Sequence, residues 1–231
     1  MNVVGRSYRI SLPALAAASL VLVTTALVLV FFVAPTDADQ GFSQRIFYFH
    51  VPIALTSYAC FGWGAWKALL HLWKRREGAD LESYVAIHIG VIFGILTLAT
   101  GSIWARISWG KWWVWSEKQL VLFLVLFLFY SAYFMLRFSV EAGPQRANLC
   151  AVYSIFGVIL IPVSFLAIRL ANQYIHPVAF NRHGPQMAGS QFFTFLVSLA
   201  AMLALAGALY RVELLGKRLD ERLRELRELL A

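Results

Sequence analysis

The most informative part of this chain is WARISWGKWWVW, residues Trp104–Trp115, which lies in a short polar break between two long apolar runs. It holds five of the eight tryptophans of the protein. A loop so rich in indole rings, set between two segments long enough to cross a bilayer, offers an apolar, π-rich surface at the edge of the membrane. The sequence therefore predicts a membrane protein whose middle loop holds a ligand.

The composition is that of an integral membrane protein. Apolar residues make up 60% of the 231 residues and charged residues 14%, whereas soluble domains are about half apolar and about a quarter charged. With spans of about 20 residues, the chain has room for about six helices and short loops. The net charge of +8 comes mostly from Lys and Arg that flank apolar runs and set topology, so we reject a nucleic-acid partner.

Six apolar runs are predicted to cross the membrane as helices, which makes the fold all-α. Arg6 and Arg9 precede the first run, which is too long for a cleaved signal peptide, so we expect a retained first helix. Pro162 is expected to kink the fifth helix. The six runs are Pro13–Val33, Pro52–Trp73, Leu81–Ile103, Leu120–Leu136, Leu149–Leu170 and Gln191–Tyr210.

The basic residues predict how the helices are oriented. If the N-terminus is inside, thirteen Lys and Arg fall in cytoplasmic segments and six in outward segments, as the positive-inside rule favours. Residues 1–210 are thus expected to form a six-helix transmembrane domain with both ends in the cytoplasm. The outward segments are expected at about 34–51, 104–119 and 171–190.

The C-terminal tail differs in kind from the apolar runs. In residues 211–231, leucines recur at four- and three-residue spacings with charges between them. This pattern predicts a cytoplasmic amphipathic helix. Such a helix could pair with a partner, or lie on the membrane lipid or on another subunit. The leucines are Leu219, Leu223, Leu226 and Leu230.

Two of the five histidines precede a proline near the outward end of a helix. His50 stands in RIFYFHVP, and His176 stands in NQYIHPVAF, one residue before Pro177. The residue before a proline disfavours the α conformation, while proline itself suits the first turn of a helix. We therefore expect His50 just before the second helix and His176 after the fifth, at similar depth on the outer face.

Iron porphyrin is a ligand that fits these features. Its macrocycle is apolar and flat, and its iron accepts a neutral imidazole nitrogen on either face. Its anionic propionates pair with basic side chains, and Gly110 would let the loop backbone turn and approach the ring closely. The basic residues available for the propionates are Arg106, Lys111, Lys118 and Arg182.

Simpler interpretations stay open on the residues alone. Tryptophans gather at membrane interfaces as anchors, which accounts for Trp63, Trp66 and Trp73. A histidine at the interface is commonly an ordinary hydrogen-bonded residue, and His183 looks like a solvated loop residue.

His88, inside the third helix, faces either a helix packing seam or a buried hydrogen bond, although an ionisable residue inside the membrane is also a functional candidate. A haem buried in the bilayer would need a second ligand such as His71, which is expected at a different depth.

The segment WGKWWVW, Trp109–Trp115, resembles the tryptophan-rich signature WGxWWxWD of haem-handling membrane proteins. FYFHVP and the outward HP dipeptide are similar to the two histidine motifs of the same proteins. With six helices and this length, the whole chain resembles the CcmC family of cytochrome c maturation system I. The resemblance implies haem b as transient cargo, with His50 and His176 as axial ligands. It also implies a platform lined by Trp109, Trp112, Trp113 and Trp115, to which the neighbouring Trp104 is added.

The resemblance also implies the partners. Proteins of this kind present haem on the external face of the bacterial inner membrane and pass it to the periplasmic haem chaperone CcmE, which attaches it covalently. The ABC transporter complex CcmAB and the small protein CcmD then release the loaded chaperone. On this basis the chain is not expected to be an enzyme.

The family signature is altered at its end. Ser116 and Lys118 stand where the family has aspartate and arginine, with Glu117 between them. Lysine keeps the positive charge but not the bidentate geometry of arginine. Glu117 could take over the acidic role by a shift of one residue.

Two other functions compete with haem delivery. A cytochrome c haem lyase of the related CcsBA type would attach haem directly to apocytochrome, but such proteins usually carry more helices and a large external domain. A transporter of haem or of a small solute would need polar residues along a path through the bilayer. Beyond His88 and scattered Ser and Thr, the sequence shows no such path.

Overall fold

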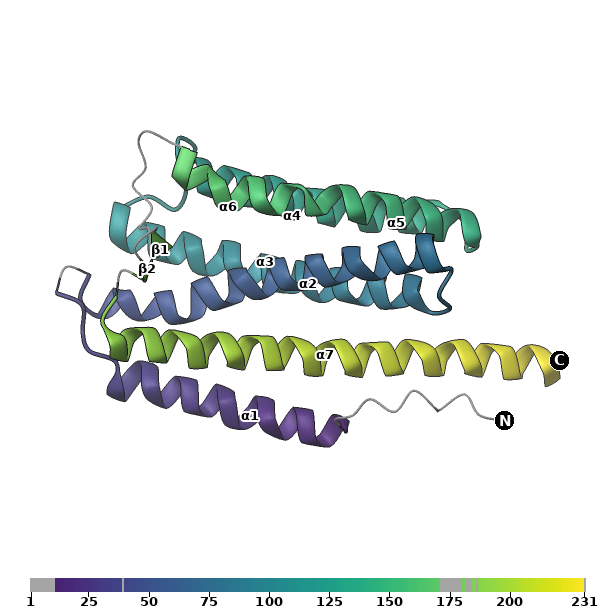
Figure 1. The fold of residues 1–231 in the computed structure, drawn as a ribbon, viewed down its shortest axis with the longest axis horizontal. Coiled ribbons are helices and arrows are strands. Elements are labelled where there is room, and N and C mark those ends of the chain that lie inside the picture. The colour runs from purple at the N-terminus through teal and green to yellow at the C-terminus, as the bar shows by residue number, and fades with distance from the viewer. Residues whose placement is uncertain (1–10, 39, 171–179, 182–183, 186, 231) are drawn as a thin grey trace.

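The computed structural model describes residues 11–230 apart from residues 39, 171–179, 182–183 and 186. The regular secondary structure of the described chain is helical, apart from one pair of two-residue antiparallel strands and an isolated β-bridge between Asp37 and Gly41. Figure 1 shows the elements in chain order. They are α1 (Leu12–Val28), the π-helical turn η1 (Leu29–Val33), the 3₁₀ helix η2 (Phe42–Ile46), α2 (Phe47–Lys74), α3 (Ala79–Trp109), α4 (Lys118–Ser139), α5 (Pro144–Val158), α6 (Leu160–Leu170), β1 (Phe180–Asn181), β2 (Gly184–Pro185) and α7 (Gly189–Leu230).

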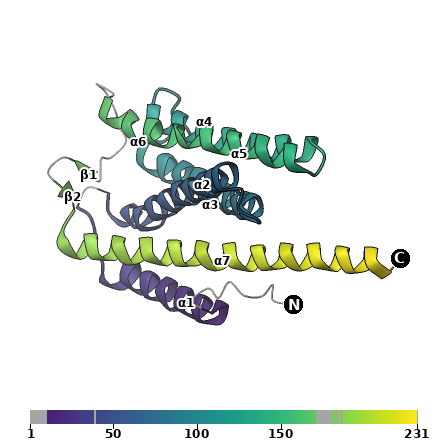
Figure 2. The same ribbon diagram turned by 45° about the vertical axis from the view of Figure 1, so that its right-hand side comes forward.

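The helices form three layers with α2 and α3 in the middle. Helices α4, α5 and α6 cover one side of this pair, and α7 with α1 covers the other (Figures 1 and 2). Helix α2 packs against α3, α5 and α7, while α1 packs mainly against α7. The α2–α3 pair is therefore the element that joins the two outer layers.

The structure confirms an all-helical, multi-pass membrane protein. Among the described residues, five helical segments are long and apolar enough to span a bilayer. Helix α2 has 28 residues but is not one of the five. The count of six spans and their orientation stay predictions. The five segments are Leu12–Val33, Ala79–Trp109, Lys118–Ser139, Pro144–Ser164 and Gly189–Leu230.

The fifth predicted helix is interrupted in the structure, and the sixth is longer than predicted. The fifth run is divided into α5 and α6 at Ile159, three residues before Pro162, which has no N–H to continue the hydrogen-bond ladder. The helix is thus interrupted one turn before the proline, while a change in the direction of its axis stays a prediction. The predicted tail helix is a continuation of α7, which runs for 42 residues without a break. Its leucines at 219, 223, 226 and 230 are exposed, and what they contact stays a prediction.

Small residues bring α2 and α3 into close contact. A Cβ atom at Gly64 would lie 2.8 Å from Ile87, and one at Gly90 would lie 2.7 Å from the ring of Phe61. Serines add reciprocal bonds across the pair: Ser57 donates to the carbonyl of Gly90 and Ser83 to the carbonyl of Gly64, each at 2.8 Å. In lipid, such packing and interhelical hydrogen bonds hold helices together.

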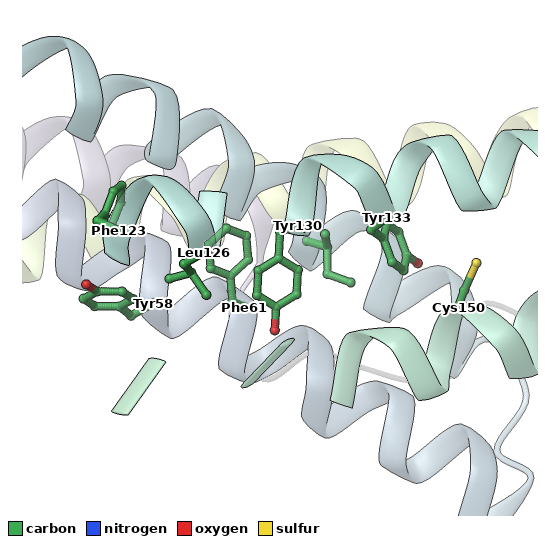
Figure 3. Packing of buried hydrophobic residues seen from close by; sticks show 8 residues of the cluster. Tyr58, Phe61, Phe123, Leu126, Tyr130, Tyr133 and Cys150 are labelled. Carbon is green, nitrogen blue, oxygen red and sulfur yellow. The ribbon is translucent and has the colours of Figure 1, made fainter. Parts of the chain in front are cut away.

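An aromatic stack joins α2 to α4. The rings of Phe61 and Tyr130 lie parallel, with centroids 3.9 Å apart (Figure 3). Tyr130 donates its hydroxyl proton to the carbonyl of Ser154 in α5 at 3.1 Å, and Gly157 leaves room for its ring. Phe61 is consequently held between Gly90 on one side and Tyr130 on the other.

A buried cluster of charges ties the tail to the end of the bundle where α2 ends and α3 begins. Glu82 is 3% exposed, and its carboxylate pairs with Lys67 at 2.8 Å and with Arg76 and Arg218 at 3.1 Å. Because a buried carboxylate is costly unless it is paired, these bonds fix α7 to the α2–α3 turn. Arg76 and Arg218 belong to segments predicted to be cytoplasmic, whereas Lys67 and Glu82 lie in the adjoining ends of the second and third predicted runs.

We expect Gly90→Ala to destabilise the fold, because Phe61 cannot retreat from the added methyl group without breaking its stack on Tyr130. The expected loss is about 1–3 kcal/mol, measured by thermal unfolding in detergent with tryptophan fluorescence. Gly62→Ala, also within a helix but with nothing within 4 Å of the added atom, is the control and should be neutral or slightly stabilising. Equal effects of the two changes would contradict the packing described for α2 and α3.

Candidate functional site

The tryptophan-rich segment is partly helix and partly loop. Helix α3 ends at Trp109, and Gly110 follows in the left-handed conformation with φ 72°. Only part of the predicted outward segment 104–119 is loop, since Trp104, Arg106 and Trp109 lie in α3 and Lys118 begins α4; its outward placement stays a prediction. The helix continues because nothing in WARISW interrupts it before Gly110, whose left-handed backbone is a common helix stop.

The tryptophan rings meet edge to face. Trp104 and Trp109 have centroids 4.9 Å apart at an interplanar angle of 77°. Trp113 and Trp115 are 5.8 Å apart at 66°. The side chain of Trp115 is 73% exposed, and that of Trp112 is 60% exposed. The loop thus presents apolar ring surface to its surroundings, and the predicted use of that surface as a haem platform stays a prediction.

Arg106 organises the start of this loop. Its guanidinium donates a hydrogen bond to the carbonyl of Gly110 and lies 6.0 Å from the ring of Trp112. A basic side chain in the last turn of a helix commonly binds the terminal carbonyls in this way. This role was missed in the sequence, although the four-residue spacing of Arg106 and Gly110 signals it. Lys111 and Lys118 are exposed.

One buried polar atom of the loop has no hydrogen-bond partner among the described residues. The indole Nε1 of Trp113 is buried and makes no hydrogen bond within the part of the chain that the structure describes. Buried N–H groups are costly when unpaired, so an acceptor at this position would be favourable. Glu117, which follows the loop, is 4% exposed, whereas Ser116 beside it is exposed.

His50 lies in the first turn of α2, which begins at Phe47. The expectation that it precedes the helix is wrong, because η2 leads directly into α2 and Pro52 is accommodated inside the helix. The error arose because proline disfavours but does not forbid a helical neighbour, and here it removes one donor near the helix start. The last residues of the predicted outward segment 34–51 are thus helical, while its outward placement stays a prediction.

Helix α3 holds the ring of His50. Nδ1 of His50 lies 3.0 Å from Oγ1 of Thr100, and a Cβ atom at Gly101 would lie only 2.9 Å from Cε1 of His50. Trp104 follows on the next turn of the same helix face. The half-buried His50 and the base of the tryptophan segment are thereby placed on neighbouring turns of α3. Thr100 and Gly101 were not predicted from the sequence, because their contact with His50 depends on how α2 and α3 pair.

The other candidate residues are distributed differently. His176, Arg182 and His183 lie outside the described residues, so the pairing of His50 with His176 stays a prediction. His71 bonds to Oδ1 of Asn148 at 3.2 Å. His88 bonds to the carboxylate of Glu213 in α7 at 2.8 and 2.9 Å, so of the two alternatives it makes a hydrogen bond, although its side chain is 41% exposed and not buried. In the described ranges, no three His, Cys, Asp or Glu side chains cluster as a metal site.

Comparison with known proteins gives the family. The family model described as "Heme exporter protein C" matches residues 3–228. A Heme exporter protein C of Paracoccus denitrificans is 32% identical over 202 residues, covering 87% of this chain and 82% of the relative. Another, of Bradyrhizobium diazoefficiens, is 32% identical over 189 residues, covering 82% and 71%. A putative cytochrome c biosynthesis ccmC-like mitochondrial protein of Arabidopsis thaliana is 30% identical over 181 residues, covering 78% and 68%.

The chain therefore belongs to the Heme exporter protein C family, whose members are membrane proteins that handle haem in cytochrome c maturation. The family resemblance drawn from Trp109–Trp115 is confirmed.

We expect Gly110→Ala to destabilise the loop by about 1–2 kcal/mol, because a Cβ atom is strained in the left-handed backbone. Gly110→Asn is the matched variant, since asparagine adopts this conformation more readily and the position has open space around it. The melting temperature in detergent should fall more for alanine than for asparagine. The reverse order would be incompatible with a left-handed residue at the end of α3.

Proposed function

We propose that this member of the Heme exporter protein C family binds haem on the Trp104–Trp115 segment at the periplasmic face of the inner membrane. His50 and His176 are the axial ligands of the iron. The haem is then delivered to the chaperone CcmE, on which the covalent bond forms, while CcmAB and CcmD release the loaded chaperone. In this proposal the chain makes no covalent bond to haem itself.

The observation that carries the proposal is the position of His50 beside the tryptophan segment. Helix α3 contacts the His50 ring through Thr100 and Gly101, and one turn further it carries Trp104, which packs against Trp109. A neutral imidazole is a common ligand of haem iron. An iron ligand and an aromatic surface at adjacent turns supply the two kinds of contact that a porphyrin needs.

The charges and polar atoms of the loop suit the propionate edge of haem. Lys111 and Lys118 are exposed, and Arg106 lies beside Trp112; such cations pair with carboxylates. The buried indole N–H of Trp113 is a further donor that a propionate oxygen would satisfy. These residues support haem binding with its charged edge directed to the loop.

The axial ligands are tested by the visible absorption spectrum of the detergent-purified protein, expressed with haem supplied. We expect a six-coordinate low-spin haem. His50→Ala and His176→Ala should each remove one ligand and shift the spectrum towards a five-coordinate form or lose the haem. His88→Ala is the control, because His88 bonds to Glu213 in α7, and it should leave the spectrum unchanged. A wild-type spectrum in both test variants would rule out these ligands.

The platform is tested by comparing two equally exposed tryptophans. Trp115 is 73% exposed in the loop, and Trp73 is 77% exposed near the other end of the bundle. Trp115→Leu should lose a stacking contact of about 0.5–1.5 kcal/mol, which is a roughly two- to tenfold drop in haem affinity, measured by haem titration. Trp73→Leu should bind haem as the wild type does. Equal losses from both would indicate that the tryptophans act only as membrane anchors.

A further inference from the structure

Thr100 makes contacts that determine where the protons of His50 lie. Its Oγ1 atom lies 2.7 Å from the carbonyl oxygen of Leu96 and 3.3 Å from that of Thr97. The same atom lies 3.0 Å from Nδ1 of His50. A hydroxyl has a single proton, so it can donate fully to only one of these neighbours.

The distances decide which neighbour receives that proton. Two oxygen atoms 2.7 Å apart need a proton between them, and the carbonyl of Leu96 has none to give. The proton of Thr100 is therefore directed to Leu96, in the i−4 bond that helical threonines commonly make. Towards His50, Oγ1 then offers only a lone pair, so the 3.0 Å contact requires a proton on Nδ1.

We propose that Thr100 is a positioning residue that holds His50 in the tautomer protonated at Nδ1, and that it thereby assigns Nε2 as the iron-binding atom. The second clause rests on the proposed function of His50 as a haem ligand, whereas the first does not. In the neutral imidazole, a proton on Nδ1 leaves the lone pair on Nε2. Metal-bound histidines are oriented by a hydrogen bond from their other ring nitrogen in the same way.

Gly101 lets the ring of His50 lie close against α3. A Cβ atom at residue 101 would lie 2.9 Å from Cε1, 3.5 Å from Nδ1 and 3.7 Å from Nε2 of His50. The absence of this atom lets the imidazole lie against α3, where the hydroxyl of Thr100 is within reach. Neighbouring residues of α3 thus fix both the position of the ring and its tautomer.

The same α2 stripe that packs on α3 carries His50. His50, Ser57 and Gly64 recur at seven-residue spacing, and each contacts α3: His50 at Thr100, Ser57 at Gly90, and Gly64 at Ile87. The register of the two helices is therefore set at three points, and the contact of His50 with Thr100 is the outermost of them. The bond between them is part of this register and not an isolated surface contact.

The first half of the proposal is tested on the haem-free, full-length protein. Histidine labelled with ¹⁵N is observed by NMR in detergent or nanodiscs, and the His50 signal is assigned by its loss in His50→Gln. We expect the Nδ1-protonated pattern in the wild type and in Thr100→Ser, which keeps the hydroxyl. Thr100→Val, nearly isosteric, should lose this pattern while the signal of His88 and the melting temperature stay unchanged. Retention of the Nδ1-protonated pattern in Thr100→Val would overturn the proposal.

The second half is tested with haem. Loss of a group that orients a metal ligand typically weakens binding by about 10–100-fold, so we expect a drop of this size in haem affinity for Thr100→Val and near wild-type affinity for Thr100→Ser. The low-spin absorption band and the midpoint potential should change in the valine variant alone. Unchanged affinity, band and potential in Thr100→Val, with the band lost in His50→Ala, would overturn the positioning role while leaving the proposed function intact. An unchanged band in His50→Ala would instead refute the ligand assignment itself.

Discussion

The close approach of α2 and α3 is the constraint on which the rest of the structure depends. In lipid, apolar side chains gain little from meeting one another, so helix association relies on close packing and on hydrogen bonds between helices. Gly64 and Gly90 allow the backbones to approach, and Ser57 and Ser83 close reciprocal bonds across the gap. The α4–α6 layer joins this pair through Phe61 and Tyr130, and α7 joins it on the opposite side. A shift of register between α2 and α3 would therefore disturb every layer.

The two ends of this helix pair are built on different physical principles. At the end with the α2–α3 turn, Glu82 satisfies three cations and joins the tail of α7 to the bundle. Separating these charges would leave a buried carboxylate unpaired, which is costly, so the ion pairs hold the tail of α7 to this end of the bundle. At the end with Gly110, exposed indole rings and the exposed Lys111 and Lys118 leave surface available for contact. A fixed end and an open end suit the proposed function, in which the protein keeps its fold while haem binds and leaves.

The sequence predicted the cores of the helices well, because the thickness of a bilayer imposes the length of each apolar run. The predicted helix ends were wrong, because hydropathy indicates which residues contact lipid, whereas a helix ends at its last backbone hydrogen bond. Trp104–Trp109 is polar enough to interrupt an apolar run, yet the helix ends only where Gly110 turns left-handed. The prediction placed His50 before its helix because Pro52 was taken to mark the helix start, whereas the helix already begins at Phe47. The contact of His50 with Thr100 is tertiary, and only the seven-residue spacing of His50, Ser57 and Gly64 signals it in the sequence.

His50 and His88 show how the hydrogen-bond acceptor at Nδ1 tunes an imidazole as a ligand. His88 bonds through Nδ1 to the carboxylate of Glu213, whereas His50 contacts a neutral hydroxyl through Nδ1. A hydrogen bond from a metal-bound imidazole raises its basicity as a ligand, and a charged acceptor makes the stronger bond. A carboxylate beside His50 would thus strengthen the bond from Nε2 to iron, which suits a resident cofactor. A hydroxyl whose own proton is held by Leu96 orients the ring with less effect on its basicity. Under the proposed function, in which haem has to leave again, orientation without strong retention is the more suitable arrangement.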